Sequence, residues 1–335
     1  MFTREVFECV DLHTAGGPLR LILSGYPPLP AGGLLEKRRY LEERLDDYRR
    51  LLLSEPWGRD GMVGCLLAEA ERQGSTAGLI FMDEGGYLRM CGHGAIAVAT
   101  YLVDSGRVRA GEDGVATLTF DVPSGHVTAR AFWDGQRVSE VALEISPAFA
   151  EAIGREIPVR GRRLSMDIGY GGAFFAIVRA GDVTASVELS QLDALRAWVP
   201  DIRRAVEDSG LARHPVDRDL DGLSGVIFTA PAHERGHHSR NVTIYGDGQI
   251  DRSPTGTGLA ARLAVLAQTE GLSAGRPIVV ESLIDTTFSG ELLGEGEPLG
   301  HVGTIRAAVT GSAHVTGFRR FFHDPADPIP PFTIR

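Results

Sequence analysis

A single cysteine stands at the start of a long apolar run, directly before two spaced glycines. The segment reads MCGHGAIAVATYLVDSG and covers residues 90–106. The apolar run predicts a helix, and a helix N-terminus presents unpaired N–H groups and a partial positive charge. That field favours a thiolate and binds carboxylates. Cys91 is therefore a candidate base or nucleophile, and His93 is placed to contact a ligand or to tune the thiolate.

The same layout recurs at Thr255-Gly-Thr-Gly, with a threonine in place of the cysteine. Two such helix starts, facing each other across a cleft, would hold a small carboxylate by backbone N–H groups, with its α-carbon between residues 91 and 255. This geometry suits proton transfer next to a carboxylate. Asp251 lies four residues before Thr255, where it either caps a turn or pairs with a substrate ammonium.

The other reactive residue types give weaker signals. Cys9 and Cys65 lie in strand-like or apolar contexts and are interpreted as buried core residues. The histidines of HERGHHSR are interpreted as part of a solvated loop, because a metal site needs further well-placed ligands. No metal site is expected.

Lys37 is the only lysine of the chain. It lies among charged residues where Leu41, Leu45 and Leu52 recur at helical spacing, so we expect it on a solvated helix face. Pyridoxal phosphate needs a buried lysine, and a P-loop needs a lysine within its glycine-rich motif. No cofactor is therefore expected.

The candidate site residues must be positioned by helices and strands, which the sequence pattern also predicts. The pattern predicts strands over 6–24, a helix over 34–53, strands over 76–90 and helices that end at Gly106 and Gly271. Residues 10–25 resemble 166–181, as Cys91-Gly-His-Gly resembles Thr255-Gly-Thr-Gly. We therefore expect an α+β protein of two related lobes, residues 1–155 and 156–315, with a tail over 316–335 that returns to the first lobe.

Composition narrows the function classes. The 335 residues carry a net charge of −10 without a basic block, which argues against nucleic acid and anionic membranes as partners. No apolar run is long enough for a membrane span or a signal peptide. Three cysteines without a CxxC pair fit a reducing cytoplasm.

At these residues the sequence resembles the proline racemase family. The matching segments are DLHTAGGPLR, MVGCLL, MCGHGAIAVAT, DIGYGGAFFAIV and RNVTIYGDGQIDRSPTGTGLAARLAVL. The resemblance covers nearly the whole chain. It implies the diaminopimelate-epimerase-like fold, in which each lobe wraps a barrel-like sheet around a central helix and the active site lies between the lobes. It also implies an imino acid substrate and a homodimer.

The resemblance also assigns roles to residues. Racemases of the family use two cysteines, one on each face of the substrate α-carbon; Cys91 matches the first, and Thr255 stands at the second. Asp251 and His93 match residues that contact the substrate nitrogen, and Tyr245 and Val63 match pocket-wall positions. The backbone contacts to the substrate carboxylate fall at Gly92, His93, Gly256 and Thr257.

Thr255 stands where racemases of the family have their second cysteine, and this difference suggests which reaction the protein catalyses. An aliphatic hydroxyl is too weakly acidic to act as the second base of a racemase without a base beside it. The Cys/Thr pairing resembles the trans-3-hydroxy-L-proline dehydratase branch. In that substrate the α-hydrogen and the hydroxyl share one ring face, so a single thiolate there can drive a syn elimination of water. Thr255 would then shape the opposite face or hydrogen-bond the ligand.

Other functions stay open at this point. A hydroxyproline 2-epimerase or proline racemase with an unusual second residue is the alternative within enzymes. A non-catalytic amino-acid-binding protein is the alternative of another class. A thiol redox protein is disfavoured, since Cys91 has no partner cysteine nearby in the sequence.

Overall fold

The computed structural model describes residues 5–334, which form two compact units. Unit 1 runs up to Val141 and takes in the segment from Ser312 onward, and unit 2 comprises Ala142–Gly311. The division falls inside one long strand, ahead of the boundary near residue 155 expected from the sequence.

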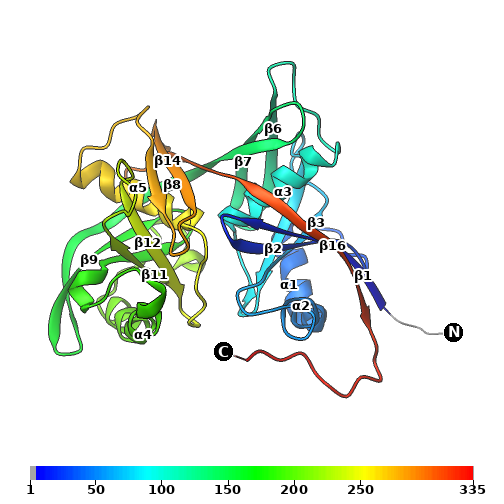
Figure 1. The fold of residues 1–335 in the computed structure, drawn as a ribbon, viewed down its shortest axis with the longest axis horizontal. Coiled ribbons are helices and arrows are strands. Elements are labelled where there is room, and N and C mark those ends of the chain that lie inside the picture. Colours follow the sequence, from blue (N-terminus) through cyan, green and yellow to red (C-terminus); the bar gives the residue numbers. More distant parts are fainter. Residues whose placement is uncertain (1–4, 335) are drawn as a thin grey trace. The chain divides into compact units, whose positions relative to one another are not determined.

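Unit 1 contains a hairpin, two short outer helices, a second set of strands around one long helix, and a strand from the C-terminal segment (Figure 1). Its elements are β1 (Glu5–Thr14), β2 (Gly17–Ser24), α1 (Leu34–Arg44), α2 (Asp46–Leu53), β3 (Val63–Ala68), β4 (Ala77–Asp83), β5 (Gly86–Tyr87), α3 (Gly92–Asp104), β6 (Val115–Val122), β7 (Gly125–Trp133), the start of β8 (Val138–Val159) and β16 (Ala313–His323).

Unit 2 repeats this order with one long outer helix in place of two short ones. Its elements are the rest of β8, β9 (Arg162–Tyr170), β10 (Phe174–Arg179), α4 (Leu192–Asp208), β11 (Leu223–Ala230), β12 (Ser239–Tyr245), α5 (Gly256–Thr269), β13 (Ile278–Glu281), β14 (Thr287–Glu295) and β15 (Ile305–Gly311), with short 3₁₀ turns at Ala180–Val183, Leu189–Gln191 and Arg218–Leu220.

Strand pairing shows the duplication directly. The order is β7-β6-β4-β3-β2-β1-β16 in unit 1 and β14-β13-β12-β11-β10-β9-β8 in unit 2. Parallel pairs occur at matching places, β2–β3 with β10–β11 and β4–β6 with β12–β13. In unit 2 a further pairing of β15 with β8 closes the sheet into a barrel.

Each unit encloses one apolar helix. α3 packs against β1, β2, β7 and β16, and α5 packs against β9, β10, β14 and β15 (Figure 1). A helix that is apolar on all sides can be stable only when it is buried on all sides. Both helices stop at the predicted glycines, where Gly106 and Gly271 adopt left-handed backbone with φ of 72° and 64°. The predicted α+β fold with a sheet around a central helix is confirmed.

Two expectations about the outer layer of unit 1 are wrong. The helix expected over 34–53 is two helices, because the backbone leaves helical geometry at Leu45 and Asp46 then begins α2 with an acidic first turn. Lys37 is buried, at 8% exposure, rather than solvated. Periodicity could not show that the loop after β2 covers that face of α1.

Among residues 5–334, no helix combines the length and apolarity needed to cross a membrane.

Candidate active site

Cys91 is the N-cap of α3 and is buried in unit 1. Its backbone is extended, and the first helical bond runs from the Ala95 N–H to the Cys91 carbonyl at 2.9 Å. The Cys91 side chain makes no capping hydrogen bond to its own helix. The N–H groups of the first turn therefore keep their capacity to bind an anion, and their dipole acts on the nearby sulfur.

His93 lies beside the cysteine. Its Nδ1 and Nε2 atoms are 3.6 Å and 3.9 Å from the Cys91 sulfur. The Thr14 hydroxyl donates to the His93 carbonyl at 2.8 Å, and a Cβ on Gly17 would come within 3.3 Å of the imidazole. The turn between β1 and β2 thus holds His93 in place. An imidazole at this distance can stabilise a thiolate or pass a proton to and from it.

The second glycine of each motif makes room for the side chain at the helix start. This glycine is Gly94 in Cys91-Gly-His-Gly and Gly258 in Thr255-Gly-Thr-Gly. A Cβ on Gly94 would lie 2.6 Å from the Phe81 ring and 3.1 Å from the Cys91 sulfur. A Cβ on Gly258 would lie 3.0 Å from the Thr255 methyl group. These glycines are required by packing beneath residues 91 and 255, in addition to any approach of a ligand.

Thr255 is the N-cap of α5 in unit 2 and is held in an unusual conformation. Its φ of 68° is left-handed, which costs a β-branched residue on the order of 1–3 kcal/mol. Its hydroxyl does not cap the helix, although threonine commonly does so. Instead the Thr255 oxygen lies 2.9 Å from Asp251 Oδ2 and 2.7 Å from the Thr243 hydroxyl.

Asp251 organises the loop that precedes α5. Its Oδ1 accepts bonds from the Ser253 N–H and hydroxyl, both at 2.8 Å. Its Oδ2 accepts from the Tyr245 hydroxyl at 3.2 Å and from the Thr255 hydroxyl at 2.9 Å. These four bonds use the acceptor capacity of a carboxylate, so a substrate ammonium would have to share Oδ2 with a hydroxyl. The predicted contact of Asp251 with the substrate nitrogen stays a prediction.

A second set of bonds fixes the same loop from β12. The Asn241 amide donates to the Pro254 carbonyl at 3.2 Å and accepts from Arg262 at 2.9 Å. Arg262 also donates to the Ser239 hydroxyl at 2.7 Å. Burial lowers the pKa of Arg262 to about 10, so the guanidinium stays charged at neutral pH. The sequence did not single out these residues, because the bonds depend on the register of β12 against the loop.

The glycine turns of the two hairpins have parallel roles that the sequence only hinted at. In unit 2 a Cβ on Gly171 would lie 2.3 Å from the Thr257 carbonyl oxygen and 2.6 Å from the Ala261 nitrogen. The β9–β10 turn therefore presses on the start of α5, as the β1–β2 turn presses on His93. The glycine pair that recurs in the two hairpins was the feature of the sequence that could have indicated these two contacts.

The predicted site residues gather within each unit. Unit 1 holds Cys91, Gly92 and His93 at one helix start, with Val63 buried at the beginning of β3. Unit 2 holds the others at the second helix start: Tyr245, Asp251, Thr255, Gly256 and Thr257.

The remaining cysteines differ from Cys91 in their surroundings. Burial raises the pKa of Cys9 to about 12. Burial, with a further contribution from the charge of Cys91, raises the pKa of Cys65 well above its usual range. All three cysteines are free. Neither Cys9 nor Cys65 is therefore a thiolate near neutral pH.

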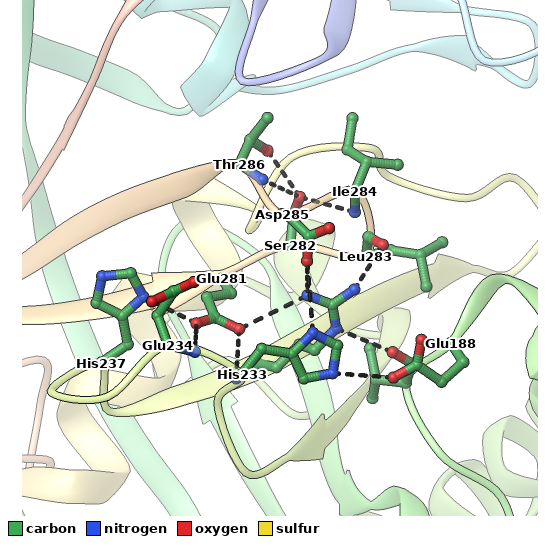
Figure 2. Close-up of polar contacts among 12 residues, drawn as sticks. Glu188, His233, Glu234, His237, Glu281, Ser282, Leu283, Ile284, Asp285 and Thr286 are labelled. Carbon is green, nitrogen blue, oxygen red and sulfur yellow. Dashed lines mark hydrogen bonds and ion pairs between the residues drawn. The ribbon is translucent and has the colours of Figure 1, made fainter.

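The histidine-rich loop is exposed from His233 to Gly236, as expected, and is also anchored by hydrogen bonds to Glu281 (Figure 2). Glu281 accepts the N–H groups of His233 and Glu234 and contacts the His237 ring, each at 2.8 Å. Burial alone would raise the pKa of Glu281, but these bonds outweigh it and hold the pKa at about 2. His233 and His238 contact other carboxylates, at 3.0 Å and 3.1 Å.

A family model described as proline racemase matches residues 9–331. The chain belongs to the proline racemase family. Two relatives with different named activities have nearly the same sequence identity to this chain. A trans-3-hydroxy-L-proline dehydratase of Bacillus cereus is 37% identical, with coverage of 98% of this chain and 97% of the relative. A proline racemase of Acetoanaerobium sticklandii is 36% identical, with 96% of each chain covered.

Two solved structures share the fold. A hydroxyproline epimerase of Agrobacterium vitis, with bound trans-4-hydroxy-L-proline, matches with a TM-score of 0.89 at 22% identity, covering 100% of this chain and 97% of that one. A probable proline racemase of Agrobacterium radiobacter, with bound carbonate, matches with a TM-score of 0.87 at 26% identity, covering 96% and 94%. The chain therefore belongs to an enzyme family whose relatives with racemase and dehydratase names are equally similar to it.

Proposed function

We propose that this family member is a trans-3-hydroxy-L-proline dehydratase, a cofactor-independent hydro-lyase that forms Δ1-pyrroline-2-carboxylate. The observation that carries the proposal is the state of Thr255, whose hydroxyl is bonded to a carboxylate at the position of the second racemase cysteine. The dehydratase name of relatives 37% identical to this chain supports it.

The surroundings of Thr255 argue against a second base. The Thr255 hydroxyl has one hydrogen for two acceptors, Asp251 Oδ2 and Thr243 Oγ1, and the charged carboxylate is the stronger acceptor of the two. A carboxylate is also far too weak a base to remove that hydrogen. An alkoxide on Thr255 would face the negative charge of Asp251 at 2.9 Å, which opposes its formation. Residue 255 therefore stays neutral and cannot take a proton from the substrate.

Cys91 supplies the single base of the reaction. The thiolate takes the α-proton, and the electron pair of the broken C–H bond becomes the new double bond between C2 and C3. The C3–O bond breaks as the hydroxyl gains a proton and leaves as water. The thiol formed in the first transfer, His93 beside it or a water molecule supplies that proton. The enamine product then tautomerises to the cyclic imine.

The family resemblance supplies the substrate contacts of this proposal. The substrate carboxylate is bound by backbone N–H groups at helix starts, those of Gly92, His93, Gly256 and Thr257. The ring nitrogen lies near Asp251 Oδ2, where it shares the oxygen with the Tyr245 hydroxyl. The thiol must stay reduced, so a reducing cytoplasm suits the reaction; the homodimer stays a prediction.

The test is incubation of the purified protein with trans-3-hydroxy-L-proline and detection of pyrroline with o-aminobenzaldehyde. We expect product with the native protein and none with Cys91→Ser, because a serine hydroxyl is not ionised at neutral pH. Racemisation of L-proline without any pyrroline would overturn the proposal.

A hydroxyproline 2-epimerase or proline racemase is the second candidate, favoured by the racemase relative at 36% identity. Deuterium from the solvent separates the possibilities. An epimerase returns deuterium to the α-carbon with inverted configuration, whereas a dehydratase consumes the substrate. A non-catalytic binding protein exchanges no α-hydrogen at all.

A further inference from the structure

The only lysine of the chain lies in a cavity and has no partner. Lys37, in the second turn of α1, is 8% exposed. Within residues 5–334, no side chain or carbonyl lies at hydrogen-bonding or ion-pairing distance from its ammonium. Lysine side chains that are this far buried are ordinarily paired with an anionic group.

The cavity has the size and position of a small-molecule site. Its volume is about 870 Å³, within the ~300–1,000 Å³ common for ligand pockets. It opens where the parallel strands β2 and β3 stop pairing, after Ile22 and Leu66. Ligands of α/β sheets favour the carboxyl ends of parallel strands. The loop after β2 contributes three prolines to the wall, so that side of the cavity has a restricted backbone.

The cavity lies on the opposite face of the sheet from the candidate active site. Side chains alternate along β3. Gly64 faces Leu53 of α2, and Leu66 packs in the cluster that includes residues of α1 and α2. Cys65, between them, points the other way, to the same side as its cross-strand partner Phe81, whose ring lies against Gly94 of α3. None of the proposed substrate-binding residues lines the cavity.

We propose that the Lys37 cavity binds a small organic monocarboxylate with an apolar body. The Lys37 ammonium pairs with the carboxylate, and Leu29, Leu66 and the prolines contact the body. Glu69 and Glu71 also line the cavity, and Glu71 accepts the Leu34 N–H at the start of α1. Because these two carboxylates repel a polyanion such as phosphate more strongly than a monoanion, the proposal is restricted to ligands with one negative charge.

The single lysine allows a site-specific test. Lysine labelled with ¹³C and ¹⁵N gives one side-chain resonance from the whole chain. It is titrated with propanoate, 4-methylpentanoate and phenylacetate, each beside its neutral amide, and with inorganic phosphate. We expect a saturable shift with at least one carboxylate and none with its amide. No shift with any of the three, or an equal shift with phosphate, would show a merely hydrated lysine.

Two variants keep Lys37 as the probe. Leu29→Asp places a like charge in the cavity and is expected to weaken carboxylate binding about tenfold or more. Arg39→Met removes an exposed cation from the same helix and is expected to leave the titration unchanged. An unchanged titration with Leu29→Asp would mean that the shift arises elsewhere, and would refute the site. Neither variant touches the proposed dehydratase residues, so its activity assay is independent.

Discussion

Replacement of Thr255 by valine isolates one hydroxyl group. Valine is also β-branched, so the strain at φ of 68° is the same in both proteins. The change removes the bonds to Asp251 and Thr243, at 2.9 Å and 2.7 Å, and adds no bulk. Any effect on turnover is therefore that of the hydroxyl alone.

The expected effect on catalysis is small. If the neutral hydroxyl only orients the substrate or Asp251, its loss removes about 0.5–1.5 kcal/mol of net hydrogen bonding, which lowers kcat/KM about 2- to 12-fold. If the hydroxyl were a general acid or base, the loss would be about 10²- to 10⁴-fold. The two ranges do not overlap. Loss of the bonds to Thr243 and to Asp251 Oδ2, which keeps the bond from the Tyr245 hydroxyl, should lower the free energy of unfolding by about 1–3 kcal/mol.

The assay is steady-state formation of pyrroline from trans-3-hydroxy-L-proline, with urea unfolding run on the same preparations. The fall in kcat caused by Cys91→Ser shows how large the effect of losing the catalytic base is in this assay. A fall in kcat of a hundredfold or more for Thr255→Val, with intact folding, would refute the one-base mechanism. Thr255→Cys extends the series, since a second thiol should introduce some exchange of the α-hydrogen of L-proline with solvent deuterium.

Three further predictions concern reactivity, packing and acid stability. Iodoacetamide should label Cys91 first, because burial raises the pKa of the other two thiols; mass spectrometry of the digest checks this. Gly171→Ala should cost about 3 kcal/mol or more in urea unfolding, because its Cβ would lie 2.3 Å from the Thr257 carbonyl oxygen, whereas Gly181→Ala, with open space, should cost little. The pKa of Glu281 is lower in the folded state, at about 2 against 4.5, so its contribution of about 3 kcal/mol should be lost as pH falls from about 4.5 towards 2, and Glu281→Gln should flatten that slope.

Each of these has a contrary outcome. Equal labelling of all three cysteines would mean that the surroundings of Cys9 and Cys65 open readily to solvent. Equal stability of the two glycine variants would mean that the hairpin turn does not press on α5. A native-like slope between pH 4.5 and 2 in Glu281→Gln would assign the acid transition to other carboxylates.

Local pattern was enough to predict the two helix starts. Cys91 and Thr255 each open a four-residue motif with two glycines, and a mostly apolar helix follows. Helix caps, terminal glycines and the apolar pattern of a buried helix can all be recognised from residues that are adjacent in the sequence. The duplication was also visible, because both halves keep the order of strand, glycine turn and helix.

Features that depend on contact between distant segments were not predictable. The Asp251 carboxylate is engaged by Thr255 nearby, but the loop is fixed by Asn241 on β12 and Arg262 on α5. Those partners meet only after β12 finds its register. The burial of Lys37 was also not predictable. Its charged neighbours in the sequence predict a solvent-exposed face of the helix, and the burial depends on the loop after β2, which lines the same cavity.

The return of the C-terminal segment to unit 1 has a consequence for synthesis. β16 pairs with β1 from Glu5 opposite His323 to Thr14 opposite Ala313. β1 therefore leaves the ribosome early but waits for a partner made near the end of the chain. At usual translation rates the interval is on the order of ten seconds or more, long enough for the continuous segment of unit 2 to fold first. The Cys91 half of the enzyme is thus completed after unit 2, and until then β1 exposes an unpaired edge to which chaperones can bind.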